Sequence, residues 1–247
     1  MSIFDIFSKK KEPVAFPVTT DIHCHVLPGV DDGSPDVNTS VELVERMQKW
    51  GIRRIFASPH ITEDTFENTP EILDNALEQL QSELTRRGNE ITLNRSSENR
   101  IDDYFRDMLG KGLIKPLPDD YLIVECSFIQ EPWELDQFLY DLKIKGFRPI
   151  LAHPERYHYY HSKNGSRYAR LHDSGTLFQI NVLSLAGAYG KTEKKVAEDL
   201  IARGYVDFIG TDLHNRNHAD IIDQYLTTSD ARRHFAAMQG RLLNDRI

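Results

Sequence analysis

Apolar positions follow two alternating patterns along the chain. Short apolar runs are followed by segments in which apolar residues recur every three or four positions, which is the spacing of one face of a helix. Strands that alternate with helices in this way are typical of an α/β fold with parallel strands. The short runs predict seven β-strands, at residues 18–23, 52–58, 91–96, 121–128, 148–152, 177–183 and 205–210.

Turn and cap residues mark the ends of the expected helices. Ser34 is expected to cap the first helix, Pro35 stands in its first turn, and Gly51 can end it. Thr69 opens the second helix in the same way, and Gly88 is a natural stop. No linker rich in Ser, Gly or Pro divides the chain, so we expect a single domain built as a barrel or barrel-like sheet of parallel strands.

Residues that commonly bind metal ions follow six of the seven predicted strands. They are His23, His25, Asp31, Asp32, His60, Glu98, Glu125, His153, Asp212 and His214. In a parallel barrel the carboxyl ends of the strands lie on one face, so these side chains are expected to meet in one pocket. The set exceeds what one ion requires, which indicates two or three ions with bridging carboxylates. Imidazole and carboxylate ligands suit manganese, iron or zinc.

Each of these residues has a simpler explanation when it is taken alone. His23 and His25 can share one face of a strand by chance, and His60 could cap the turn that follows it. Glu98 could be a solvated residue and Glu125 an ion-pair partner. All of these explanations would have to hold together, at the same end of six strands. We therefore favour the metal site.

Composition narrows the possible functions. The 247 residues include 30 Lys and Arg against 38 Asp and Glu, a formal net charge of −8, which argues against a broad surface for nucleic acid. Two cysteines, Cys24 and Cys126, do not suggest a disulfide framework, so a reducing, cytoplasmic location is expected. No apolar run approaches the roughly 18 residues of a membrane helix, and no secretory signal is visible.

The first residues differ in composition from the rest. Residues 1–16 are expected to form a flexible basic head, followed by one domain over residues 17–247. Apolar residues beside Lys9, Lys10 and Lys11 could make a weak peripheral membrane contact through residues 1–12. A frayed terminus is the favoured interpretation, because the segment is short.

Several ordered motifs resemble those of the PHP superfamily (polymerase and histidinol phosphatase). Within it they look like the bacterial metal-dependent tyrosine-protein phosphatases of capsule and exopolysaccharide biosynthesis. The resemblance covers about residues 20–218 and rests on DIHCHVLPGVDDGS (21–34), ASPHIT (57–62), SSENR around Glu98, VECSF (124–128), AHPERY (152–157) and GTDLHN (210–215).

The resemblance implies a distorted (β/α)7 barrel that holds three divalent metal ions, usually manganese. Carried over by motif, His23 and His25 with Asp212 would serve the first ion, and Glu98 would bridge the first and second. Glu125 and His153 would complete the second ion. The third ion would be held by Asp32, His60 and His214.

The substrate phosphate would be bound by arginine. Arg156 of HPER matches the arginine that this family places against the phosphate, a task that suits a planar guanidinium. Many members carry a second such arginine after the final Asp-x-His-Asn, and there this chain departs from the family. Arg216 or His218 is expected to take over, and spacing leaves the choice between them open.

The expected activity is hydrolysis of phosphotyrosine by a metal-activated hydroxide. Neither cysteine has the arginine six positions later that a cysteine-dependent phosphatase needs, because Val30 and Pro132 stand there. The expected partner is a phosphotyrosine-containing protein, a bacterial tyrosine kinase of polysaccharide synthesis or export. Two alternatives stay open: a small-molecule phosphomonoesterase resembling histidinol phosphatase, and a non-catalytic phosphotyrosine-binding module. The oligomeric state is not predicted.

Overall fold

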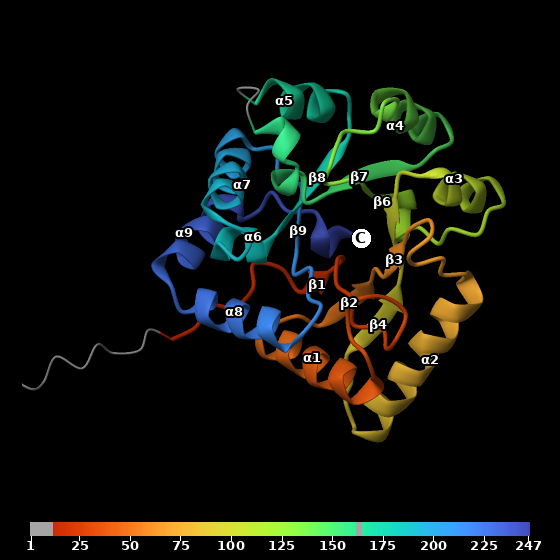
Figure 1. Cartoon of the computed structure of the whole chain (residues 1–247). Coiled ribbons are helices and arrows are strands. Elements are labelled where there is room, and N and C mark those ends of the chain that lie inside the picture. Colours follow the sequence, from red (N-terminus) through yellow and green to blue (C-terminus); the bar gives the residue numbers. More distant parts are fainter. Residues whose placement is uncertain (1–11, 162–164) are drawn as a thin grey trace, which may run out of the picture.

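Parallel strands form the centre of the computed structural model, which describes residues 12–161 and 165–247 (Figure 1). Along the chain they are β1 (Thr20–Asp21), β2 (Arg54–Ala57), β3 (His60–Ile61), β4 (Thr92–Arg95), β5 (Glu98–Arg100), β6 (Tyr121–Glu125), β7 (Arg148–Ala152), β8 (Leu177–Asn181) and β9 (Phe208–Gly210). They pair in the order β1-β2-β4 in one sheet and β3-β5-β6-β7-β8-β9 in the other. All of these pairs are parallel.

The two sheets form one curled layer of strands. Residues 58–59 separate β2 from β3, residues 96–97 separate β4 from β5, and backbone hydrogen bonds continue the pairing across this break. On the opposite side, a parallel bridge between Cys24 and Leu213 places the chain after β1 beside the chain after β9. The strands thus bend around a common centre and point their carboxyl ends the same way.

Helices surround this layer (Figure 1). They are α1 (Val37–Lys49), α2 (Pro70–Arg86), α3 (Asp103–Gly110), α4 (Leu135–Ile144), α5 (Ser166–Asp173), α6 (Val182–Ala186), α7 (Lys191–Arg203), α8 (Arg216–Leu226) and α9 (Ser229–Met238), with short 3-10 helices η1 (Pro118–Asp120), η2 (Pro154–Arg156), η3 (His158–Tyr160) and η4 (Asn244–Arg246). Among the described residues, no helix is both long and apolar enough to cross a membrane.

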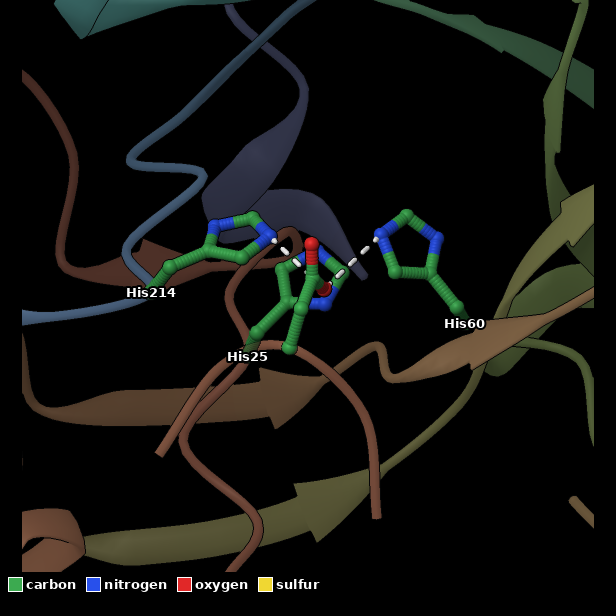
Figure 2. Close-up of side chains that lie close together, drawn as sticks. His25, His60 and His214 are labelled. Atoms are coloured by element: carbon green, nitrogen blue, oxygen red, sulfur yellow. Dashed lines mark ion pairs between the residues drawn. The ribbon is translucent and has the colours of Figure 1, made fainter. Parts of the chain in front are cut away.

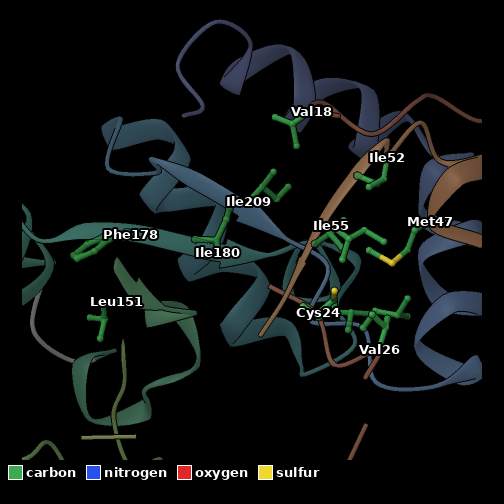
Figure 3. Close-up of a cluster of buried hydrophobic side chains, with 14 of the residues drawn as sticks. Val18, Cys24, Val26, Met47, Ile52, Ile55, Leu151, Phe178, Ile180 and Ile209 are labelled. Carbon is green, nitrogen blue, oxygen red and sulfur yellow. The ribbon is translucent and has the colours of Figure 1, made fainter. Parts of the chain in front are cut away.

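Alternate residues of the strands supply two apolar clusters. In β6, Leu122 and Val124 belong to the larger cluster, which includes the buried faces of the helices, whereas Tyr121 and Ile123 belong to a smaller one. Because successive side chains of a strand point to opposite faces, the smaller cluster fills the inside of the curl. Figure 3 shows part of the larger cluster, with labelled side chains of Val18, Cys24, Val26, Met47, Ile52, Ile55, Leu151, Phe178, Ile180 and Ile209.

Each of the seven predicted strands has a counterpart in the structure, and the parallel α/β architecture is confirmed. The strand β7 has the predicted bounds, and the other six are shorter than predicted: β6, for example, ends at Glu125, and β8 passes directly into α6 at Val182. The short strands β3 and β5 were not predicted, because two or three residues are too few to produce a pattern.

One predicted helix cap is wrong. Asp36 caps α1, and its side chain accepts a hydrogen bond from the backbone N–H of Thr39 at 2.9 Å. Ser34 is buried instead, and its backbone N–H donates to the carbonyl oxygen of His25 at 3.0 Å. The prediction for Thr69 is confirmed, since its hydroxyl accepts a hydrogen bond from Ile72. Both Ser and Asp can cap a helix, so residue type alone did not decide between Ser34 and Asp36.

The proposed N-terminal head lies mostly outside the described residues, as does most of the segment 1–12 expected to contact a membrane. From residue 12 onward the chain packs on the domain. Val14 donates a backbone hydrogen bond to Leu226, and Phe16 is buried and donates one to Trp50. These residues lie before the domain boundary that we expected at residue 17.

Asn244 connects the first and last strands. Its side-chain amide donates to the carbonyl oxygens of Thr20 and Ile209 at 3.0 and 2.8 Å, and its oxygen accepts from the Ile209 N–H at 3.2 Å. The side chain is fully buried, so no water can replace these bonds when it is removed.

Asn244→Ala should therefore lower the free energy of unfolding by about 2–3 kcal/mol, because buried backbone groups of Thr20 and Ile209 lose their partner. Urea denaturation measures this change. Gln224→Ala, on the exposed side of α8, is the control and should change it little. Equal stabilities of the two variants would contradict the role assigned to Asn244.

Candidate metal centre

A cavity of about 320 Å³ opens at the carboxyl ends of the strands. Its lining includes His60 in β3, Glu98 in β5, Glu125 at the end of β6, and His153 directly after β7. Asp212 lies two residues after β9. Residues far apart in the sequence meet here because parallel strands place their carboxyl ends on one face. This is the convergence that the sequence predicts.

Four buried side chains form the deepest group: His23, His25, Glu98 and Asp212. Nε2 of His23 lies 3.1 Å from Oε2 of Glu98, and Nε2 of His25 lies 3.3 Å from the same oxygen. Both nitrogens also lie within 3.6 Å of Asp212 Oδ1. Among the described residues, Nε2 of each histidine and Oε2 of Glu98 have no hydrogen-bond partner. Buried polar atoms left without partners are costly, and a cation between them would satisfy all three.

A second group lies toward the mouth of the cavity. Figure 2 shows His25, His60 and His214 turned toward a common space. The dashed lines mark the ion pairs that His60 and His214 make with Asp32, each with Nε2 3.6 Å from Oδ1. The rings of His25 and His214 stack at 3.9 Å. Three imidazoles and one carboxylate within this space are a suitable ligand set for a divalent ion.

A third group contains Glu125. Oε2 of Glu125 lies 3.7 Å from His60 Nδ1, which is 3.2 Å from Glu98 Oε2. His153 contacts the other oxygen of Glu98, with Nε2 2.8 Å from Oε1. Arg100 donates to Glu125 Oε1 at 3.0 Å. Glu98 therefore belongs to both this group and the deepest one, as a bridging carboxylate would.

The carboxyl groups differ in their electrostatic environment. Burial, with the nearby Glu98 carboxylate, raises the pKa of Glu125 to about 8. Burial also acts to raise the pKa of Glu98, but the charges of His23 and His60 and the hydrogen bond with His153 lower it well below its usual value. Cations at this site would let both carboxylates stay ionised, because they remove the repulsion between them.

Hydrogen bonds orient the two deepest histidines. Nδ1 of His23 lies 2.6 Å from Gln179 Oε1, and Nδ1 of His25 lies 2.7 Å from Asp31 Oδ2. Both oxygens act as acceptors, so each Nδ1 carries a proton, and in the neutral form of each ring the lone pair is on Nε2, the nitrogen that faces Glu98. This is the arrangement in which histidine binds a metal ion.

Asp212 is held from several sides. Asn181 Nδ2 donates to its Oδ2 at 2.6 Å, and the Tyr189 hydroxyl does so at 3.2 Å. Its backbone has φ 50°, and that of His153 has φ 33°, in the left-handed region that non-glycine residues seldom adopt. The Asp212 N–H donates to His23 O at 2.8 Å, which helps to hold this conformation.

The arginine singled out by the sequence reaches the cavity. Arg156, at the end of η2, lies 3.1 Å from Asp212 Oδ2. Its guanidinium carbon lies 4.6 Å from the ring centre of Phe128 and 4.1 Å from that of Tyr189. The two rings keep the planar group in one orientation beside the cavity that all three residues line.

Of the two candidates after β9, the structure brings only one to the cavity. His218 lines it, with its ring centre 5.5 Å from that of His214. Arg216 is exposed and binds Glu42 of α1 at 2.7 Å. Residues two positions apart on a helix point in nearly opposite directions, so α8 cannot present both side chains to one site.

Asn181, at the end of β8, reaches the site through its hydrogen bond to Asp212. Sequence analysis found the ligand residues but not every side chain that supports them. It missed Gln179, Tyr189 and Phe128. Gln179 is the one with a visible signal, because it is a polar residue in the middle of an apolar strand. The other two have none, since an aromatic residue in a loop is as readily explained by packing.

Comparison with known proteins shows which family the chain belongs to. The family model described as capsular polysaccharide synthesis, CpsB/CapC, matches residues 19–222. The chain is 34% identical over 196 residues to tyrosine-protein phosphatase YwqE of Bacillus subtilis, which is 79% of this chain and 77% of that protein. It is 27% identical over 205 residues to tyrosine-protein phosphatase CpsB of Streptococcus agalactiae, which is 79% of this chain and 82% of that protein.

Solved structures agree with this placement. A crystal structure from a study of YwqE from Bacillus subtilis and CpsB from Streptococcus pneumoniae, described as unique metal-dependent tyrosine phosphatases, matches with a TM-score of 0.76 and 30% identity, covering 92% of this chain and 94% of that one. Histidinol phosphate phosphatase from Lactococcus lactis shares the fold, with a TM-score of 0.55 and 19% identity over 91% of this chain and 95% of that one. The chain therefore belongs to the CpsB/CapC family of capsular polysaccharide synthesis.

Proposed function

We propose that this chain is a metal-dependent protein-tyrosine phosphatase of the PHP type. The observation that carries the proposal is the set of buried, unpartnered ligand atoms of His23, His25 and Glu98, which face one another beside the guanidinium of Arg156. The names of the relatives agree with this activity. We also infer that residues 17–247 form the family's distorted (β/α)7 barrel, supported by the bridge between Cys24 and Leu213.

Three divalent ions fit the donor groups, with manganese favoured and iron or zinc compatible. In this proposal His23, His25 and Asp212 hold the first ion, and Glu98 bridges it to a second that Glu125 and His153 complete. The third ion is held by Asp32, His60 and His214. When bound, such ions polarise a phosphoryl oxygen and make water reactive near neutral pH.

The side chains around the ions complete the reaction. In this proposal Arg156, which lines the cavity beside Asp212, binds two phosphoryl oxygens and stabilises the charge that develops on them. We assign His218 to the leaving group, because it lines the cavity. Only its protonated ring can donate a proton to the phenolate oxygen, and burial lowers the pKa of His218, so this assistance is greatest below neutral pH. Phenolate, with a pKa near ~10, leaves readily even without this assistance. Arg216 has no part in this proposal.

The proposed substrate is a phosphotyrosine-containing protein, a bacterial tyrosine kinase of polysaccharide synthesis or export that meets the enzyme in the cytoplasm. Both cysteines are free and buried, which is compatible with a reducing compartment. The likeness to histidinol phosphate phosphatase is one of fold alone, and it does not favour a small-molecule substrate.

Glu98→Gln tests the bridging role. The substitution removes the charge shared by two ligand groups, so bound metal and turnover of a phosphotyrosyl peptide should both fall, turnover by more than about 100-fold. Elemental analysis and a phosphate-release assay measure the two effects. Gln224→Ala is the control, because that exposed residue of α8 lies outside the cavity. Full activity of Glu98→Gln without bound metal would exclude the proposed chemistry.

Asp31→Asn tests the orientation of His25. An amide can donate a hydrogen bond to Nδ1 and thereby favour the wrong tautomer of the ring, so metal affinity should fall by about 10–100-fold. Titration with manganese, followed by calorimetry, gives the affinity, and excess manganese should restore activity. An unchanged affinity would show that Asp31 does not position His25.

Arg156→Lys keeps the positive charge but loses the planar pair of donors. The specificity constant kcat/KM for an aryl phosphate should fall by about 100-fold, while the bound metal stays at the wild-type amount. Arg170→Lys, at an exposed arginine of α5, is the control. The assignment of Arg156 to the phosphate fails if the two variants are equally active.

A further inference from the structure

The loop from Cys126 to Glu134, between β6 and α4, carries three large apolar side chains at the surface. Phe128 is 38% exposed, Ile129 90% and Trp133 99%. Side chains of this size are normally buried, and several exposed on one short segment mark a contact surface. The other tryptophan, Trp50, is 3% exposed and donates its ring N–H to Asp223.

Hydrogen bonds and ion pairs hold this loop in place. The Cys126 N–H donates to the Tyr157 hydroxyl at 2.9 Å, and the Tyr159 hydroxyl donates to the carbonyl oxygen of Ser127 at 2.9 Å. Farther along, Arg167 of α5 forms an ion pair with Glu131. The base and the middle of the loop are fixed, so its exposed apolar groups are held toward solvent.

The apolar surface begins inside the candidate active site. Phe128 lines the cavity, and its ring stacks on that of His153 at 5.6 Å with an angle of 23° between the planes. Five residues later, Trp133 lines a separate cleft of about 630 Å³. Ile129 lies between them in the sequence. This one loop therefore carries apolar side chains both at the cavity, where the Phe128 ring lies 4.6 Å from the guanidinium carbon of Arg156, and at the separate cleft beside Trp133.

We propose that residues 126–134 form a docking surface for the polypeptide around the phosphotyrosine. Phe128 contacts the aromatic ring of the substrate, and Ile129 and Trp133 contact the residues that flank it. This inference rests on the proposed phosphatase function and deepens it: the loop makes the enzyme select phosphotyrosine within a protein over a free aryl phosphate.

The charged residues near Trp133 favour a polypeptide over an anionic membrane as the partner of this surface. The cleft beside Trp133 is lined by three carboxylates and two guanidinium groups, namely Glu131, Glu134, Asp136, Arg167 and Arg170. Both arginines form ion pairs with Glu131 or Asp136, so the cleft presents charges of both signs that nearly balance. Such a mixed polar lining beside apolar groups suits the backbone and side chains of a peptide. An anionic membrane would instead require clustered basic residues, and this chain has a net charge of −8.

The test compares two substrates of the manganese-loaded enzyme. One is a phosphotyrosyl peptide with several residues on each side of the phosphotyrosine, and the other is p-nitrophenyl phosphate, which has no flanking residues. Trp133→Ala and Ile129→Ala should each lower kcat/KM for the peptide by about tenfold, mainly through KM, and leave p-nitrophenyl phosphate unaffected. Phe128→Ala should lower both values. Ile144→Ala, 69% exposed at the end of α4, is the matched control and should change neither.

Three results would overturn the docking surface while leaving the phosphatase function intact. One is an equal effect, or no effect, of Trp133→Ala and Ile129→Ala on the two substrates. Another is that either variant loses an oligomer that the wild type forms in size-exclusion chromatography, while its preference for the peptide is unchanged. That result would assign the surface to a second copy of the chain. The third is that either variant loses binding to phosphatidylglycerol vesicles while its preference for the peptide is unchanged, which would assign the surface to a membrane. A wild-type enzyme that hydrolyses neither substrate would overturn both proposals.

Discussion

The mutual approach of histidine and carboxylate groups around one oxygen of Glu98 constrains everything else in this structure. Three imidazole nitrogens, from His23, His25 and His60, lie 3.1–3.3 Å from Oε2 of Glu98 in a region that is largely shielded from water. Bringing so many polar groups out of water is unfavourable unless they are compensated. The parallel strands supply the rigidity that keeps them together, and bound cations would supply the compensation.

The sequence predicted those parts of the structure that produce a regular pattern of residue types along the chain. Seven apolar runs and the ligand types that follow them were enough to predict the parallel strands and the convergence at their carboxyl ends. The strands β3 and β5 could not be found, because their pairing comes from the curl of neighbouring strands and not from any local periodicity. The residue that caps α1 was also predicted wrongly. Ser34 and Asp36 are both good caps by residue type, and only tertiary packing decides that Asp36 is the cap.

Side-chain direction was the least predictable feature. Arg216 and His218 stand two positions apart, and only the start of α8 at Arg216 determines that one faces the cavity and the other faces Glu42. Tyr189 reaches Asp212 from the segment between α6 and α7, which no spacing rule connects to β9. Three of the ligand residues, His60, Glu98 and Glu125, lie in strands, and the others follow the strand ends. Loops farther from the strands position Tyr189 and Phe128, as is common where a stable scaffold carries a variable specificity.

The contact between the two ends of the curl has a consequence for how the protein is made. Thr211 donates its hydroxyl hydrogen to Asp21 at 2.5 Å, and these residues are 190 positions apart in the sequence. During synthesis the N-terminal strand β1 lacks its contact with Thr211 until nearly the whole chain has left the ribosome. Contacts of such high sequence separation are slow to form. The strand β1 can pair with β2 early, but its side toward Thr211 stays unpaired for most of translation. The deepest group, which needs both His23 and Asp212, can therefore be complete only late in synthesis.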